Sequence, residues 1–191
     1  MLVAAPLSDA RGRVGVLRAA LLLAALLGLV VPFAPSFPLL VALRAAQGLA
    51  LAGVPAVAMA YLAEEVEAKR AGAAMGLFIA GNAVGGMTGR ILVGFLSERL
   101  GWRGGLLALA LLDLALAAWF ARNVPSSRRF HPRPFEWRSI GRGLLASLGD
   151  PVLLGLYGMG FLVMGSFVTV YNYLAFSLEG PPWRLAPSAV S

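Results

Sequence analysis

The stretch AALLLAALLGLVVPFAPSFPLLVAL, residues 19–43, contains no charged residue. Comparable charge-free stretches recur at residues 45–63, 71–89 and 151–178. An α-helix rises about 1.5 Å per residue and the hydrocarbon core of a bilayer is about 30 Å thick, so roughly 20 apolar residues make one crossing. A helix of a soluble bundle would carry a polar stripe at 3.6-residue spacing, whereas these stretches are apolar all round. They therefore predict membrane-spanning helices.

The composition of the whole chain also indicates a membrane protein. Hydrophobic residues make up 59% of the 191 residues and charged residues 13%, and the mean hydropathy is +0.80. The chain has no cysteine, which excludes disulfides and thiolate metal sites. No metal-ligand cluster, phosphate-binding glycine loop or pair of nucleophile and base is visible, so we expect no enzyme activity, no cofactor and no metal. The net charge of +7 resides mainly in loops, and we expect no nucleic-acid partner because that would need a folded basic surface.

The fold class expected is an all-α, polytopic transmembrane bundle, because backbone groups inside lipid must be paired within their own segment. Eleven Lys and Arg residues fall in the loops on one side of the predicted spans and three on the other. By the positive-inside bias, the richer side is cytoplasmic. We therefore expect a multi-pass protein of the cell (inner) membrane, in contact with membrane lipid. The five predicted spans are Val14 to Val31, Phe37 to Leu62, Ala71 to Leu96, Gly104 to Phe120 and Val152 to Leu178.

A charged loop precedes the first predicted span and reads Leu7-Ser8-Asp9-Ala10-Arg11-Gly12-Arg13. Gly12 permits a sharp turn, and the charged residues anchor helix ends at the membrane interface. The loop resembles the one between helices 2 and 3 of the major facilitator superfamily, roughly G-x-L-a-D-r-x-G-r-k. Ala5 stands at the first glycine and Val14 at the final lysine of that pattern. The resemblance implies motif residues at Leu7, Asp9, Arg11, Gly12 and Arg13.

A second stretch, Arg44-Ala45-Ala46-Gln47-Gly48, resembles the R-x-x-q-G signature of the fourth helix of the same superfamily. It lies where that family has it. The resemblance implies a functional role for Arg44 and motif positions at Gln47 and Gly48.

A third stretch, GLFIAGNAVGG at residues 76–86, resembles the fifth-helix signature of the proton-coupled efflux branch. Asn82 stands where proline is usual, which departs from the antiporter pattern. Glycines at every fourth position share one helix face and permit close approach of a neighbouring helix, although ordinary helix packing without a transport role would need the same face. The motif residues are Gly81, Asn82, Gly85, Gly86 and Gly89.

The C-terminal stretch from Gly160 to Tyr173 resembles the seventh helix of a bacterial branch of sugar (arabinose-type) or drug exporters. The resemblance implies helices 3 to 7 of a twelve-helix transporter. It divides the chain into a partial N-terminal bundle at residues 1–123, a basic cytoplasmic linker at 124–150 and the start of a C-terminal bundle at 151–191. Inside the linker we expect an interfacial helix over residues 135–148 and no specific role for His131. Substrate candidates on the seventh helix are Thr169, Tyr171 and Asn172, with an interfacial tyrosine belt as the alternative.

Three charged residues are candidates for a charge deep in the membrane, where each needs a partner or an aqueous cavity. Arg44 lies about 10 Å and Asp113 about 15 Å from the outer ends of their helices at 1.5 Å per residue. We expect them to pair or to share a proton-linked cavity, because opposite charges at similar depth relieve one another's desolvation. The alternative is that Asp113 faces water or a substrate path. Arg90 lies near the outer interface, where snorkelling or substrate binding are both open.

The function expected is secondary active export of a small molecule, driven by proton antiport, through alternating access of two helical halves. Its partners are the small-molecule substrate and protons. The competing interpretation is a truncated, non-transporting membrane fragment, or a scaffold that associates through its glycine face. This alternative arises because helices 1, 2 and 8 to 12 would have to come from a missing part of the transporter.

Overall fold

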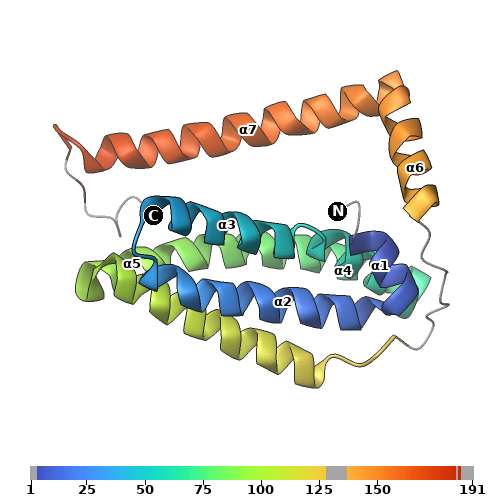
Figure 1. The fold of residues 1–191 in the computed structure, drawn as a ribbon, viewed down its shortest axis with the longest axis horizontal. Coiled ribbons are helices and arrows are strands. Elements are labelled where there is room, and N and C mark those ends of the chain that lie inside the picture. Colours follow the sequence, from blue (N-terminus) through green and yellow to red (C-terminus); the bar gives the residue numbers. More distant parts are fainter. Residues whose placement is uncertain (1–3, 128–136, 184, 186–191) are drawn as a thin grey trace. The chain divides into compact units, whose positions relative to one another are not determined.

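The computed structural model describes residues 4–127, 137–183 and 185, and these residues form helices and connecting turns without any strand. The predicted all-α class is confirmed. Contacts divide the chain into two compact units, Met1–Phe135 and Glu136–Ser191. Each unit is described by itself, and the helices of both are labelled in Figure 1. The domain boundaries expected at residues 123 and 150 stay a prediction.

The first unit begins with α1, Ala4–Arg11, and α2, Arg13–Val30. Gly12 separates them with a φ of 95°, a backbone conformation that glycine adopts without the steric penalty of a Cβ. A short 3₁₀ turn, η1, follows at Val31–Phe33. The sharp turn that the sequence predicts at Gly12 is therefore present and sets the angle at which α2 leaves the loop.

The second predicted crossing is divided into α3, Phe37–Leu51, and α4, Val54–Glu65. The sequence predicts one crossing here and does not predict the break between the two helices. Pro55 explains the break, because it has no N–H to donate to the carbonyl of Leu51 and its ring crowds that carbonyl. The whole segment Phe37–Glu65 is still 29 residues long and apolar enough to cross a membrane.

The third and fourth predicted crossings both belong to α5, Ala68–Asn123, which is 56 residues long. Its backbone is not helical at Gly101, where φ is 71° and ψ is 165°. The chain turns back at this glycine, so residues 68–100 and residues 102–123 run as two separate segments (Figure 1). A straight helix of this length would measure about 84 Å at 1.5 Å per residue, far more than one crossing. With α5 divided, the four long apolar helices of the described residues supply about five crossings.

The packing of the first unit centres on α2, which contacts α3, α4 and α5. Small residues such as Ala24, Ala25 and Gly28 are buried along it. Many large apolar side chains of the unit are exposed instead, as expected for helices whose outer surface meets lipid. One compact cluster forms near the end of α2 at which α1 lies, and it consists of Leu17, Val57 and Ala58 with Val54, Phe78 and Phe120 packed against it.

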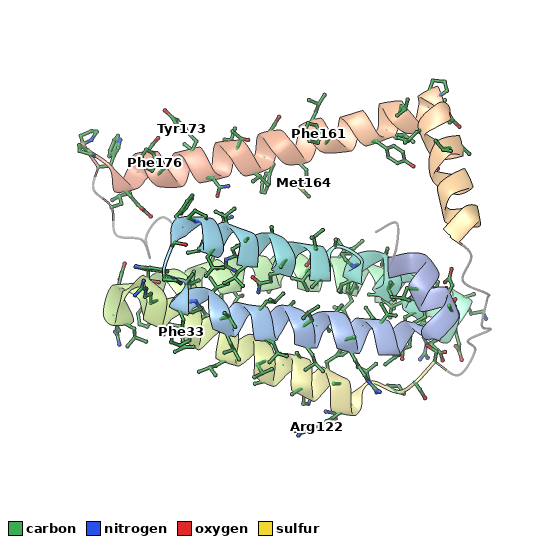
Figure 2. The ribbon with its side chains drawn as sticks, viewed as in Figure 1. Phe33, Arg122, Phe161, Met164, Tyr173 and Phe176 are labelled. Atoms are coloured by element: carbon green, nitrogen blue, oxygen red, sulfur yellow. The ribbon has the colours of Figure 1, made fainter. Side chains whose placement is uncertain are left out.

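The second unit contains α6, Trp137–Gly149, and α7, Pro151–Glu179, which contact each other. Asp150 caps α7, because its Oδ1 accepts hydrogen bonds from the backbone N–H groups of Val152 at 2.8 Å and Leu153 at 3.3 Å. Apolar side chains of α7 such as those of Phe161 and Phe176 point away from the helix into its surroundings (Figure 2). A helix is present from Trp137, where the sequence predicts an interfacial helix, and its position at the membrane interface stays a prediction. His131 and residues 135–136 lie outside the described residues.

Candidate functional site

Arg13 lies at the centre of a cluster of charged and polar side chains where α1, α2 and α4 meet. Its guanidinium forms ion pairs with Asp9 at 2.5 Å and with Glu64 at 2.6 Å. Its Nε donates to both carboxylate oxygens of Glu64 at 3.2 Å, and its Nη1 donates to the hydroxyl of Ser8 at 2.9 Å. Ser8 is fully buried. We call these four residues, Ser8, Asp9, Arg13 and Glu64, the Arg13 cluster.

The Arg13 cluster places its arginine in ion pairs within the chain. One guanidinium faces two carboxylates, and the fork of N–H donors matches their oxygens in direction as well as in charge. The cluster also joins residues that are 51 positions apart, so it holds the start of α2 against the end of α4. Its geometry indicates a structural role in which ion pairs hold α2 and α4 together. Of the other motif residues of this loop, Leu7 is half-buried, and the side chain of Arg11 lies outside the description.

Two hydrogen bonds fix the residues that follow α5, at the same end of the unit as the Arg13 cluster. Arg18 of α2 donates to the backbone carbonyl of Val124 at 2.6 Å, and the hydroxyl of Tyr61 of α4 donates to that of Pro125 at 3.2 Å. The exit from α5 is thus fixed by two different helices. We call these two hydrogen bonds the exit strap.

Farther along the bundle, Arg44 begins a chain of hydrogen bonds that connects α3 to α2. Its Nη1 donates to the side-chain oxygen of Gln47 at 2.9 Å, and the amide nitrogen of Gln47 donates to the backbone carbonyl of Ala24 at 3.0 Å. Gly28 leaves room for this contact, because a Cβ there would lie 3.0 Å from the amide nitrogen of Gln47. Two of the three predicted helix-4 motif residues therefore act together, whereas Gly48 meets open space.

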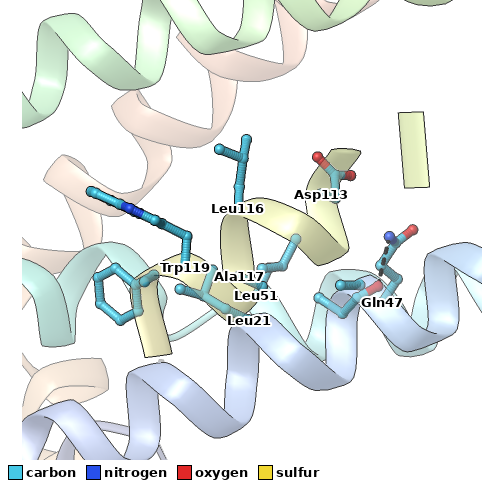
Figure 3. Close-up of a pocket in the computed structure, with 10 residues that line it drawn as sticks. Leu21, Gln47, Leu51, Asp113, Leu116, Ala117 and Trp119 are labelled. Carbon is cyan, nitrogen blue, oxygen red and sulfur yellow. Dashed lines mark hydrogen bonds between the residues drawn. The ribbon is translucent and has the colours of Figure 1, made fainter. Parts of the chain in front are cut away.

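Gln47 and Asp113 lie on facing walls of a pocket between α2, α3 and the second segment of α5 (Figure 3). The pocket has a volume of about 410 Å³. Apart from these two side chains its walls are apolar. The lining residues are Leu21, Ala24, Ala25, Gln47, Leu51, Asp113, Leu116, Ala117, Trp119 and Phe120. We call this space the Asp113 pocket.

Arg44 and Asp113, which the sequence predicts to pair, make no direct contact among the described residues. Arg44 donates to Gln47, three residues along its own helix, and no ion pair joins it to Asp113 among the described residues. The positive charge of Arg44 still attracts Asp113 electrostatically, without direct contact. Within the part of the chain that the structure describes, the carboxylate has no hydrogen-bond or ion-pair partner. The shared proton-linked cavity stays a prediction.

The helix-5 motif residues lie along the first segment of α5. Asn82 and most of the motif glycines are exposed, Gly89 is half-buried, and an added Cβ at any of the four glycines would meet nothing within 4 Å. No neighbouring helix among the described residues uses the space that the glycine face leaves. Arg90, next to this face, is exposed and already makes an interaction of its own.

The substrate candidates on the seventh predicted helix belong to the second unit. Thr169 and Asn172 are exposed on α7, and the side chain of Tyr171 lies outside the description. A small hollow of about 310 Å³ on the same helix involves other residues, namely Ser166, Phe167, Val170 and Leu174. The role of these candidates stays a prediction.

Comparison with known proteins gives the family directly. The family model described as Major Facilitator Superfamily matches residues 1–190. The chain belongs to this superfamily. It is 43% identical to the uncharacterized MFS-type transporter YybF of Bacillus subtilis, over 97% of this chain and 46% of that protein. It is 38% identical to the inner membrane transport protein YnfM of Escherichia coli, over 100% of this chain and 46% of that protein.

A more distant relative carries a named drug phenotype. The chloramphenicol resistance protein of Streptomyces lividans is 31% identical over 92% of this chain and 45% of its own length. No solved structure gives a significant match. The chain spans about half the length of these relatives. As a member of the major facilitator superfamily it is a multi-pass membrane protein of a transporter family, not an enzyme.

Sequence reasoning missed Glu64 and Ser8 in the Arg13 cluster. Glu64 is the first charged residue after the stretch at residues 45–63, so it marks the end of a crossing on the same predicted side as Arg13. That position was a usable signal for an ion pair. Ser8 gave no signal, because a small hydroxyl in a charged loop is equally common on the surface.

Proposed function

We propose that this chain is part of a secondary active transporter that exports a small molecule in exchange for protons across the inner membrane of a bacterial cell. The observation that carries the proposal is the Asp113 pocket. Asp113, an exposed carboxylate that has no hydrogen-bond or ion-pair partner among the described residues, lines a pocket of a membrane-spanning bundle. A charged side chain costs roughly 2.5–3.5 kcal/mol at the middle of a bilayer. Binding a proton removes that cost, so Asp113 is a suitable site at which a proton can be loaded and released.

Arg44 supports this role from outside the pocket. Arg44 donates a hydrogen bond to Gln47, which lines the pocket together with Asp113. A nearby positive charge favours the ionised form of a carboxylate, whereas apolar surroundings favour its neutral form. Because these two effects oppose each other, a small change of conformation could switch Asp113 between its ionised and its neutral form. The Arg44–Gln47–Ala24 chain ties the position of Arg44 to α2, so movement of α3 against α2 would alter the field at Asp113.

Export as the direction is supported by the named relative. The Streptomyces lividans chloramphenicol resistance protein aligns with nearly all of this chain. Resistance to a drug fits its removal from the cell. The resemblance of residues 76–86 to the helix-5 signature of efflux proteins points the same way, although Asn82 replaces the usual proline.

Alternating access needs two helical halves, and the relatives are about twice as long as this chain. We therefore propose that transport requires further helices of the same superfamily, supplied in the same polypeptide or by a second one. The DNA on either side of the coding sequence tests this. An open frame for further matching helices supports it, and its absence leaves only a separate partner gene.

The transport proposal is tested in everted membrane vesicles that contain the chain together with those helices. Respiration acidifies the vesicle interior, and acridine orange reports the pH gradient. Chloramphenicol and arabinose are added in turn as probes. We expect one of them to discharge part of the gradient, and we expect Asp113→Asn to abolish the response. Equal discharge by Asp113→Asn would show that protons are not carried at this carboxylate.

A second candidate function is a non-transporting scaffold, and the open glycine face favours it. Gly81, Gly85 and Gly89 leave space for a close helix neighbour, and no described residue occupies it. Gly85→Leu would then abolish capture of a tagged partner helix or second copy, whereas Gly72→Leu, at another open glycine of α5, would not. Failure of both changes to alter association in detergent would exclude the scaffold.

The proposed orientation has a direct test. Reporter tags at residues 35 and 135 should lie on opposite faces of the membrane, with residue 135 in the cytoplasm. The same face for both tags would contradict the five-crossing topology.

A further inference from the structure

The turn at Gly101, where α5 folds back, carries two arginines on the side of the membrane that the sequence predicts to be poor in positive charge (Figure 1). Arg99 precedes the glycine and Arg103 follows it. The other turn on this predicted side, residues 31–36, has no charged residue. The positive-inside bias disfavours arginines here, so their presence needs a separate physical reason.

Both arginines are exposed and lie over aromatic rings. The Cζ of Arg99 is 4.4 Å from the centroid of the Phe95 ring, and the Cζ of Arg103 is 5.0 Å from the centroid of the Trp102 ring. Such an interaction uses the positive charge of the guanidinium and leaves its N–H donors unused. Neither arginine has a hydrogen-bond or ion-pair partner within the described part of the chain. Glu98, the neighbouring acid, makes an interaction of its own.

Arginines at the opposite end of the first unit have acceptors inside the chain. Arg13 forms ion pairs with two carboxylates, and Arg18 donates to a backbone carbonyl. Among the described residues, Arg99 and Arg103 have no such acceptor. The fork of N–H donors on a guanidinium matches a pair of phosphate oxygens in spacing and in charge. These two side chains are therefore suited to an oxyanion that comes from outside the chain.

The surroundings of the two arginines are apolar and exposed. Leu100 and Trp102 in the turn are 59% and 50% exposed. Ile91, Phe95 and Arg99 follow one another at intervals of four residues, which places them along one side of the helix, and the first two are also exposed. Ile91 lies about 12 Å below Arg99 at 1.5 Å per residue. A free anion in water gains nothing from such neighbours, whereas a phospholipid combines a phosphate with acyl chains that can contact them.

Close packing fixes the backbone of the turn. Gly105 is buried, and a Cβ added to it would lie 3.0 Å from the backbone nitrogen of Ser97. The two segments of α5 therefore approach each other closely just beyond the turn. A backbone that is already ordered reduces the entropy lost when a ligand binds to its side chains.

We propose that the turn at Gly101 is a binding site for an anionic phospholipid, phosphatidylglycerol, whose headgroup phosphate accepts hydrogen bonds from Arg99 and Arg103. Trp102 lies at the level of the headgroup, where tryptophan is enriched in membrane proteins, and Phe95 contacts an acyl chain. The bound lipid fixes the level at which the turn lies in the membrane. The site is separate from the pocket described above, and the inference holds whatever the chain transports.

The experiment measures lipid preference at this place on the helix. Because the chain has no cysteine, Ile91→Cys provides a single position for a bimane fluorophore. The labelled 191-residue chain is placed in nanodiscs of phosphatidylcholine and phosphatidylglycerol, and one or the other lipid carries bromine on its acyl chains at equal mole fraction. Bromine quenches bimane only at short range, so the two quenching values give the local preference for phosphatidylglycerol. We expect a preference of about fivefold or more, the factor that one arginine contributes near a membrane surface.

Variants at the arginines identify the groups responsible. Arg99→Gln and Arg103→Gln should each lower the preference about fivefold, and the double variant should bring it close to one. Arg70→Gln, at an exposed arginine near the other end of the same segment, is the control and should keep the preference of the wild type. Thermal unfolding in neutral detergent checks that the variants are folded, and the preference of the wild type tests the proposal without any change at the arginines.

The proposal is overturned if the wild type shows equal quenching by the two lipids, or if the double variant keeps the preference. Loss of the preference in millimolar inorganic phosphate, with sodium chloride of equal ionic strength as the control, would also overturn it. That result would mean that the turn binds free anions and does not select a lipid.

Discussion

Arg13 and Asp113 are both charged residues on apolar helices, and the first unit treats them in opposite ways. Arg13 has three polar side chains around it, two of them carboxylates. Asp113 has none in direct contact within the described residues, although an arginine and a glutamine lie nearby. The first arrangement fixes the backbone of three helices. The second leaves a charge available to a ligand or a proton, at a cost in stability.

The difference follows from depth. A charge at the end of a helix can reach other loops and the polar interface, so a complete set of partners is easily assembled there. A charge in the middle of a span can be paired only by a side chain on a neighbouring helix at the same level. A sequence that keeps an unpaired charge at that depth gives up stability that a leucine would supply, which is common at functional sites.

The largest expected effect is the loss of the Arg13 cluster. Arg13→Ala removes two ion pairs and leaves two carboxylates facing each other. Breaking a buried pair costs about 3–5 kcal/mol, and partial exposure of these side chains reduces that to about 2–3 kcal/mol. The apparent melting temperature in detergent should fall by about 5–10 °C. Arg70→Ala, at an exposed arginine of α5, serves as the control and should change stability by about 0.5 kcal/mol at most.

A charge exchange sharpens this result. If Arg13→Glu combined with Glu64→Arg regains part of the stability that each change loses alone, the ion pair itself is responsible. No recovery would indicate that the fork geometry toward Ser8 and Asp9 matters more than the sign of the charges.

The second largest effect concerns the hydrogen bond between Gln47 and the carbonyl of Ala24, which lies beside Gly28. Gly28→Leu places carbon where the amide of Gln47 lies, and overpacking of this kind costs about 1–3 kcal/mol. Gly15→Leu, in the same helix but facing open space, should be neutral or stabilising because leucine favours helix more than glycine does. Thermal unfolding of the two variants compares them directly. Equal stability would mean that Gln47 moves aside at no cost and that its hydrogen bond to Ala24 does not hold α2 to α3.

The exit strap should contribute less. Arg18→Met keeps the apolar stem and removes the hydrogen bond to the carbonyl of Val124, for an expected loss of about 1–2 kcal/mol. Hydrogen exchange should report faster exchange in residues near 124 than in α2. If protection falls throughout the first unit instead, the strap belongs to the global fold and not to a local fastening.

The crossings were predictable from the sequence because length and charge alone decide whether a segment suits the membrane. The fold-back at Gly101 was also within reach, since Arg99, Gly101 and Arg103 interrupt an apolar run. The break before Pro55 was missed, because total hydropathy hides a local loss of one backbone hydrogen bond. The contact that Arg44 makes was not predicted, for a different reason. Depth places Arg44 and Asp113 at one level, but rotation of each helix about its axis decides which side chains meet, and that depends on packing.

Spacing along α3 explains why Arg44 contacts Gln47. The two are three residues apart on α3, so they share a face whatever the neighbours do. That contact could have been predicted from spacing alone. The facing of Gln47 and Asp113 across the pocket could not, because it requires knowing how α5 folds back against α2 and α3.

The smallest expected change in stability is also the most informative one. Asp113→Asn keeps the shape and removes the charge, so it takes away a desolvation cost without breaking any contact of the described residues. We expect the apparent melting temperature to stay equal or to rise slightly, by the equivalent of at most about 1 kcal/mol, whereas every change at the Arg13 cluster lowers it. The effect should vanish at low pH, where the wild-type carboxylate is itself neutral, and should grow as pH increases. A loss of stability comparable to that of Arg13→Ala would contradict the comparison, because it would mean that the charge of Asp113 holds the bundle together through the field of Arg44 and is not free for a ligand.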